Sequence, residues 1–90
     1  MAMKMIIAIV DDSDTPDVIS RLDEAGIIFS KIDTTGGFLR KGKSTLMLGV
    51  KENEVDRAID TINQSCDPSV NPLKNKATIM VLNVEHFEQI

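Results

Sequence analysis

The chain has no tryptophan, no tyrosine and a single cysteine, Cys66. One cysteine cannot form an internal disulfide, and it cannot provide a cysteine cluster for zinc. We interpret Cys66 as a small hydrophobic residue on a helix face, with a reactive thiol as the alternative. Because tryptophan and tyrosine are missing, the core must be built from aliphatic side chains together with methionine and phenylalanine.

Long apolar runs are also missing. The longest one, MIIAIV at 5–10, is too short to cross a membrane or to form a good signal-peptide core. Asp11 and Asp12 follow it directly. We therefore take the cytoplasm as the default location.

Positive charge is in deficit, and the net charge is −4. This balance argues against a general nucleic-acid binder, which would need a basic face. Four of the ten cations nevertheless gather near the middle of the chain, at Lys31, Arg40, Lys41 and Lys43. A local basic patch on an acidic protein suits a small anionic ligand better than a long polyanion.

The length of 90 residues indicates a single domain spanning 1–90. A chain of this size buries only about 60–65% of the surface that it exposes when unfolded. Its core is therefore marginal alone, and we expect copies of the chain to associate.

Apolar periodicity and turn residues divide the chain into six elements. The continuous apolar run at 5–10 is typical of a strand that is covered on both faces. Thr15 can cap a helix and Pro16 suits the first helical position, while Gly26 is a typical stop. The expected strands are 5–10, 27–33, 44–50 and 77–84, and the expected helices are 15–25 and 52–66, with a loop at 67–76 and a turn or short helix after residue 84.

This βαββαβ order predicts an α+β, ferredoxin-like fold with a four-stranded antiparallel sheet. Right-handed crossovers place the first and third strands in the centre, the second and fourth at the edges, and both helices on one face. The other face of the sheet then lacks a cover, although the central strands are apolar on both sides. Another subunit is the natural cover.

The segment TTGGFLRKGKS, residues 34–44, combines backbone freedom, an aromatic ring and positive charge. Gly36 and Gly37 can turn the chain so that bare N–H groups form an anion nest. The cations that follow add donors for phosphate, and Phe38 offers a flat surface for a base. The alternative is an ordinary strand connection with solvated cations and Phe38 folded onto the core. The segment matches neither the GxxxxGK[ST] nor the GxGxxG nucleotide motif.

Several stretches resemble the PII-like cyclic-di-AMP receptor proteins, small bacterial signal proteins related to PII in fold. They are KMIIAIV, TTGGFLRKGKSTLMLGV, INQSC, and a final hydrophobic strand with an acidic-x-Phe-x-Gln tail. TTGGFLR followed by x-Gly is the specific part. The resemblance implies a homotrimer of ferredoxin-like subunits that holds cyclic di-AMP, or another adenine nucleotide, in clefts between neighbours. It also implies a protein partner that reads the ligand state.

The resemblance further implies which residues contact the ligand. The glycine-rich loop would form one wall, and Gly49 would allow close approach. Phe87 and Gln89 of the tail would close the pocket, and Arg40 or Lys43 would lie near phosphate. The expected ligand-binding residues are Ser30, Thr34, Thr35, Gly36, Gly37, Phe38, Leu39, Arg40, Lys43, Gly49, Phe87 and Gln89. No cofactor and no metal are expected.

The chain departs from the family pattern in three places. Arginine is usual where this chain has Ile28, asparagine is usual where it has Lys43, and a much longer loop is usual at 67–76. The missing guanidinium removes a phosphate or base contact. Lys43 could add a charge, but it lacks the paired donor and acceptor of an amide. A structural or adaptor trimer that has lost its ligand is therefore the alternative function.

The remaining polar residues do not suggest an enzyme. His86, the only histidine, lies in the tail without a second histidine for a metal site, and we interpret it as a surface residue. The acidic run DDSDTP at 11–16 could bind a hard cation, but negative charge near a helix start is favourable in any case. An acylphosphatase, which is also ferredoxin-like, would need a glycine-rich loop with an arginine at that position. We expect no catalytic residue.

Overall fold

The computed structural model describes residues 2–32, 42–66, 77–86 and 88. The described residues form one sheet and a layer of helices. Their bounds are β1 Met3–Asp11, α1 Thr15–Glu24, β2 Phe29–Ile32, β3 Lys43–Lys51, the 3₁₀-helix η1 Glu52–Glu54, α2 Val55–Ser65 and β4 Ala77–Val84.

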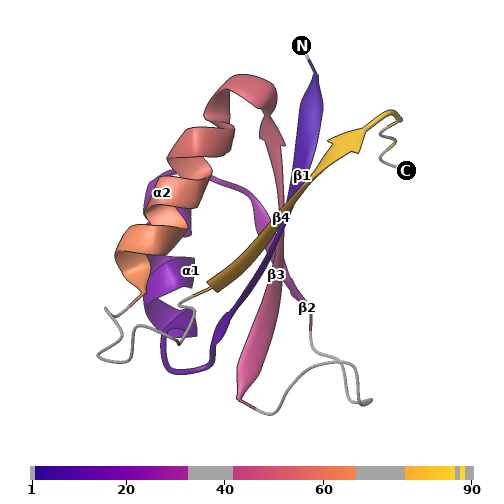
Figure 1. The fold of residues 1–90 in the computed structure, drawn as a ribbon. Coiled ribbons are helices and arrows are strands. Elements are labelled where there is room, and N and C mark those ends of the chain that lie inside the picture. Colours follow the sequence, from indigo (N-terminus) through magenta and orange to yellow (C-terminus); the bar gives the residue numbers. More distant parts are fainter. Residues whose placement is uncertain (1, 33–41, 67–76, 87, 89–90) are drawn as a thin grey trace.

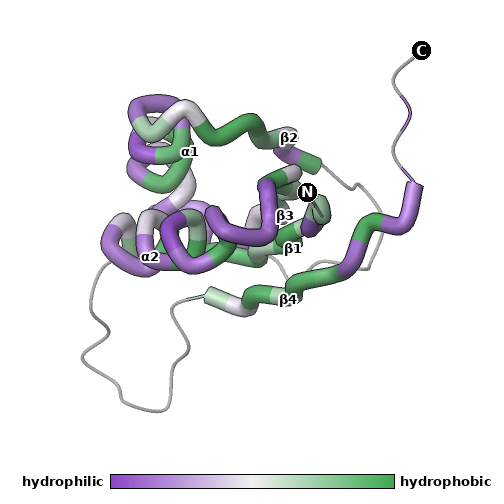
Figure 2. The backbone as a smooth tube through the Cα atoms, turned by 90° about the horizontal axis from the view of Figure 1, so that it is seen from above, coloured by the Kyte–Doolittle hydropathy of each residue, from purple (hydrophilic) through white to green (hydrophobic). Residues whose placement is uncertain are grey.

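The sheet has the strand order β2-β3-β1-β4, and each neighbouring pair is antiparallel. Both helices lie on the same side of this sheet (Figures 1 and 2). The α+β, ferredoxin-like βαββαβ fold expected from the sequence is therefore confirmed, with β1 and β3 in the centre. These two strands pair along their whole length, from Met3 opposite Lys51 to Asp11 opposite Lys43.

The core lies between the sheet and the helices, and strand alternation builds it. Ile6, Ala8 and Val10 of β1 are fully buried, and Leu46 and Leu48 of β3 lie beside them. Burying a side chain of this size stabilises the fold by about 1.5–3 kcal/mol. The helices close the core with Val18, Leu22, Ala58, Ile62 and Cys66.

The cap of helix α1 lies one position earlier than the sequence predicts. Asp14 occupies the cap position, and Thr15 is the first helical residue. The Thr15 hydroxyl donates to the backbone carbonyl of Asp11 at 3.0 Å instead of capping a helical N–H. The expectation that Thr15 caps the helix is therefore wrong. Its side chain instead ties the start of α1 to the end of β1.

The end of α1 is a glycine cap, as expected. Gly26 has a φ of +73°, and its N–H donates to the Asp23 carbonyl at 3.0 Å. The Ile27 N–H donates to the Leu22 carbonyl at 3.0 Å. Together these bonds form a Schellman motif, which needs the left-handed backbone that glycine adopts without strain.

Two other elements differ from expectation in their bounds. Strand β2 is shorter than the expected 27–33, because the N–H of Ile27 is used to cap α1 and the ladder begins at Phe29. The expected helix at 52–66 begins as the separate 3₁₀-helix Glu52–Glu54 before α2 starts. Residues 33 and 67–76 lie outside the described residues.

No described segment covers the face of the sheet opposite the helices. Residues paired across antiparallel strands share a face, so Met47, Ile7 and Met80 form one row across β3, β1 and β4. Met80 is 43% exposed and Leu82 is 48% exposed. We call this surface the open face; it comprises the side chains of the odd-numbered residues of β1 and β3, together with Ser30, Ile32, Thr78, Met80, Leu82 and Val84.

Candidate ligand site

Three of the expected ligand-binding residues are described, and all three lie on the open face. Ser30 of β2 pairs with Met47 of β3, which places both side chains on that face. Lys43 and Gly49 of β3 share the face with Met47, because strand side chains alternate. The other expected residues, Thr34, Thr35, Gly36, Gly37, Phe38, Leu39, Arg40, Phe87 and Gln89, lie outside the described residues.

Gly49 leaves free space on the open face. A Cβ atom built on Gly49 meets nothing within 4 Å in the part of the chain that the structure describes. Its φ is not positive, so the backbone does not demand glycine there. A glycine inside a strand weakens the strand and often marks a place where a ligand or another backbone approaches closely. Gly49 therefore points to a contact with something other than the described part of this chain.

Ile28 is an exposed apolar residue at the start of the neighbouring strand. It immediately precedes β2 and is 82% exposed, the largest value among the exposed large hydrophobic residues of the described chain. Phe29 pairs with Leu48, so continuing that antiparallel register by one residue would set Ile28 beside Gly49. The structure thus brings Ser30 and Gly49 to the β2–β3 edge of the open face, and Ile28 directly precedes the paired part of β2.

Lys43 forms an ion pair with the carboxylate of Asp11 across the last register position of β1 and β3. The two side chains are only 24% and 20% exposed, so solvent screens this pair less than it would screen a fully exposed one. Sequence reasoning missed this partner. The available signal was an aspartate directly after the first strand and a lysine directly before the third.

Two contacts fix the backbone where β3 begins. The Asp12 N–H donates to the Gly42 carbonyl at 2.8 Å, and the Ser44 hydroxyl donates to the Asp12 carboxylate. Gly42 has a φ of +88°, which glycine tolerates best. The described chain leaves β2 at Ile32 and returns at Gly42, so these contacts anchor the point where the segment 33–41 rejoins the sheet.

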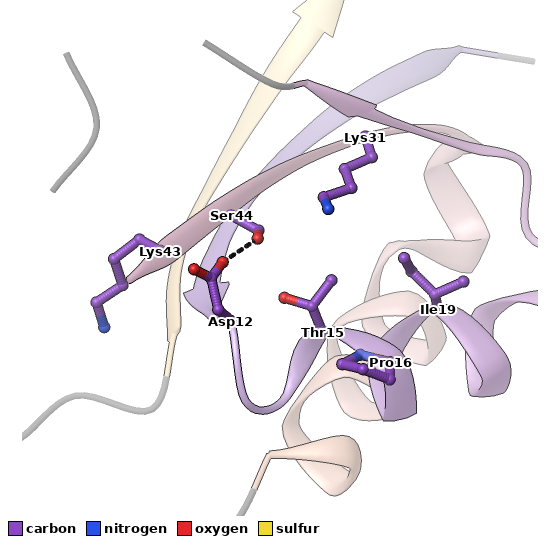
Figure 3. A pocket seen from close by; sticks show the side chains of 7 residues that line it. All are labelled: Asp12, Thr15, Pro16, Ile19, Lys31, Lys43 and Ser44. Atoms are coloured by element: carbon purple, nitrogen blue, oxygen red, sulfur yellow. Dashed lines mark hydrogen bonds between the residues drawn. The ribbon is translucent and has the colours of Figure 1, made fainter. Parts of the chain in front are cut away.

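A pocket that the sequence did not predict lies on the helix side of the same sheet end (Figure 3). Its volume is about 430 Å³, and Lys31 of β2 faces the start of α1 across it. The Thr15 hydroxyl already donates to Asp11, and the Ser44 hydroxyl already donates to Asp12. The pocket is lined by Asp12, Thr15, Pro16, Ile19, Lys31, Lys43 and Ser44.

The structure also places several side chains that the sequence singled out for other chemistry. Within residues 2–32, 42–66, 77–86 and 88, no group of three or more histidine, cysteine, aspartate or glutamate side chains is placed to hold a metal. The His86 side chain is 79% exposed, and its Nε2 atom lies 3.6 Å from Oε1 of Glu88. This agrees with the interpretation of His86 as a surface residue. Cys66 is buried, as expected for a small hydrophobe. Helices of the described chain are too short or too polar to cross a membrane.

Two comparisons with known proteins bear on this site. The sequence model of the cyclic-di-AMP receptor family matches residues 3–75, which include the segment 34–44 and end before β4 and the tail. A crystal structure of a functionally unknown protein from Pediococcus pentosaceus ATCC 25745 is 33% identical. That match covers 100% of this chain and 99% of the other, with a TM-score of 0.79.

Proposed function

Because the chain belongs to the cyclic-di-AMP receptor family, we propose that it is a PII-like signal-transduction protein that binds cyclic di-AMP. In this proposal residues 1–90 act as one domain, and the nucleotide occupies clefts between the subunits of a homotrimer. Ligand binding changes how a protein partner is recognised. The protein is a receptor and not an enzyme, and it works in the cytoplasm.

The proposed binding surface is the β2–β3 edge of the open face. Ser30, Lys43 and Gly49 contribute from the sheet, and the segment 34–40 forms a second wall. Main-chain N–H groups at Gly36 and Gly37 and the cation Arg40 bind phosphate, while Phe38 and Leu39 contact a base. The tail residues Phe87 and Gln89 close the pocket.

The free space at Gly49 is the observation that carries this proposal. Packing within the described chain does not call for glycine there, and a Cβ would meet no atom within 4 Å. The space lies at the β2–β3 edge of a face that no described segment covers. A planar base or a neighbouring backbone fits such a position, since either must come close to the strand.

Isothermal titration calorimetry of cyclic di-AMP tests the proposal directly. We expect saturable binding to the wild type and a loss of at least roughly tenfold in affinity for Gly49→Val, which fills the space with a strand-compatible side chain. Thr61→Val in α2, on the opposite side of the sheet from the open face, is the control and should bind as the wild type does. Circular dichroism must show that both variants remain folded. A wild type that gives no heat at millimolar cyclic di-AMP would contradict the proposal.

A structural or adaptor trimer without a ligand is the second candidate. The apolar Ile28 at the site and the engagement of Lys43 by Asp11 favour it. If the site is functional, Ile28→Arg should strengthen cyclic-di-AMP binding roughly tenfold, because it adds a charge-assisted hydrogen bond to phosphate. Ile28→Gln adds a polar side chain without charge and should give a smaller gain. No binding by the wild type and by Ile28→Arg would favour the adaptor.

A further inference from the structure

We propose that Asp11 is a specificity-determining residue of this nucleotide site, where it neutralises Lys43 and thereby disfavours highly charged ligands. The inference rests on the proposed function, because it takes the open-face edge as the place where a nucleotide binds. It assigns a role to a residue outside the expected ligand-binding set.

The geometry of the strand ends supports this role. Asp11 and Lys43 are the final opposed pair of β1 and β3, and they lie on the open face with Met47 and Gly49. The Asp11 carboxylate accepts a hydrogen bond from the Lys43 ammonium. Both side chains are mostly buried, so the pair does not depend on two mobile surface groups meeting in solvent.

The pair changes what Lys43 offers to a ligand. A lone ammonium attracts a phosphate in proportion to the charge that the phosphate carries, and therefore favours polyphosphates. An ammonium paired with a carboxylate forms a pair with almost no net charge, so the attraction of Lys43 for a distant phosphate largely cancels. The site can then accept a phosphodiester of low charge without also attracting ATP strongly.

Asp12 does not duplicate this function. Its carboxylate accepts a hydrogen bond from Ser44, the residue after Lys43 in β3, whose side chain projects from the opposite face of the strand. Asp11 is thus the carboxylate that the structure sets against Lys43. Removing its charge exposes the full charge of the lysine to a ligand on the open face.

The test compares cyclic di-AMP and ATP by calorimetry on the wild type, Asp11→Asn, Lys43→Asn and the double variant. We expect Asp11→Asn to raise ATP affinity roughly tenfold and cyclic-di-AMP affinity only about threefold, because ATP carries more negative charge. Lys43→Asn removes the cation that faces Asp11 and should shift the ratio of ATP affinity to cyclic-di-AMP affinity in the opposite direction. The double variant should return that ratio close to the wild-type value.

Glu54→Gln is the matched control, because it changes the net charge by the same amount. Glu54 pairs with Arg57 beyond the other end of β3, roughly 27 Å from Lys43 at the usual rise of a strand. This variant should leave both affinities unchanged. The proposal is wrong if the ratio of ATP affinity to cyclic-di-AMP affinity is the same in Asp11→Asn, Lys43→Asn and Glu54→Gln. If Asp11→Asn does not fold, the change in the affinity ratio of Lys43→Asn tests the proposal.

The two proposals fail in different ways. If the wild type does not bind cyclic di-AMP, the proposed function is wrong, and inorganic tripolyphosphate then becomes the probe for Asp11. Asp11→Asn should bind tripolyphosphate more tightly than Glu54→Gln does. Equal binding, or no binding by either variant, overturns the role of Asp11.

Discussion

At the scale of single residues, two glycines serve different purposes. Gly26 has a positive φ and forms the Schellman motif that ends α1. Gly49 has no such backbone requirement, and the space around it is open. The first glycine stabilises the end of α1, while the second leaves room for another molecule.

Gly26→Ala should lower the free energy of unfolding by about 1–2 kcal/mol, because an L side chain is strained in the left-handed region. A Cβ at this position meets nothing within 4 Å in the described chain, so strain rather than collision causes the loss. Urea unfolding followed by circular dichroism measures it. Gly26→Asn is the matched variant and should cost less, since asparagine tolerates this conformation better. Equal losses for alanine and asparagine would contradict the strain argument.

At the scale of the elements, one hydroxyl joins β1 to α1. Thr15 is 5% exposed, and it donates to the Asp11 carbonyl, which also accepts from the Asp14 N–H at 2.9 Å. Thr15→Val keeps the shape and removes the donor, so it should cost about 0.5–1.5 kcal/mol of unfolding free energy. Urea unfolding measures the change.

Thr61→Val is the control for this loss. The Thr61 hydroxyl donates to the Arg57 carbonyl at 2.8 Å, one turn earlier in α2, but this bond is exposed to water. Water can replace it, so the unfolding free energy should change by less than about 0.5 kcal/mol. If both variants lose the same stability, the buried bond at Thr15 has no special role.

The order of the elements was sufficient to predict the sheet. Alternating strand and helix patterns gave βαββαβ, and the handedness of crossovers put β1 and β3 in the centre, as observed. The start of β2 could not be predicted in the same way. Ile27 has the apolar character of a strand residue, but its N–H is taken by the cap of α1. A sequence pattern does not reveal that competition for a single donor.

The candidate site was predictable only in part. Ser30, Lys43 and Gly49 were expected from the family resemblance, and alternation along β3 places Lys43 and Gly49 on one face. The pairing of Asp11 with Lys43 depends on the register of β1 against β3, and the two residues are 32 positions apart along the chain. Register follows from how the whole sheet packs, so local pattern did not reveal the partner.

At the scale of the whole molecule, the open face exposes apolar side chains such as Met80 and Leu82. Met47, Ile7 and Met80 form its central row, on a face that no described segment covers. An exposed surface of this kind marks an interaction site. A second and third copy of the chain would bury it and enlarge the marginal core, which is the basis for the proposed homotrimer.

Met47→Asp should therefore dissociate the assembly, because it would bury an unpaired charge between subunits. Light scattering should report about three times 9.9 kDa for the wild type and a smaller mass for the variant. Asn63→Asp adds the same charge at an exposed position of α2 and should leave the mass unchanged. A wild type that is monomeric at micromolar concentration would contradict the trimer.

The claim that a nucleotide binds at the β2–β3 edge of the open face is tested most directly by NMR. The backbone amide shifts of the labelled wild type are followed while cyclic di-AMP is added. We predict that the largest changes occur at Ser30 and Gly49, while the exposed residues Asp56 and Asp60 of α2 barely move. Shifts that stay unchanged at millimolar cyclic di-AMP, or that are confined to the helix-side pocket around Thr15 and Ile19, would contradict the account.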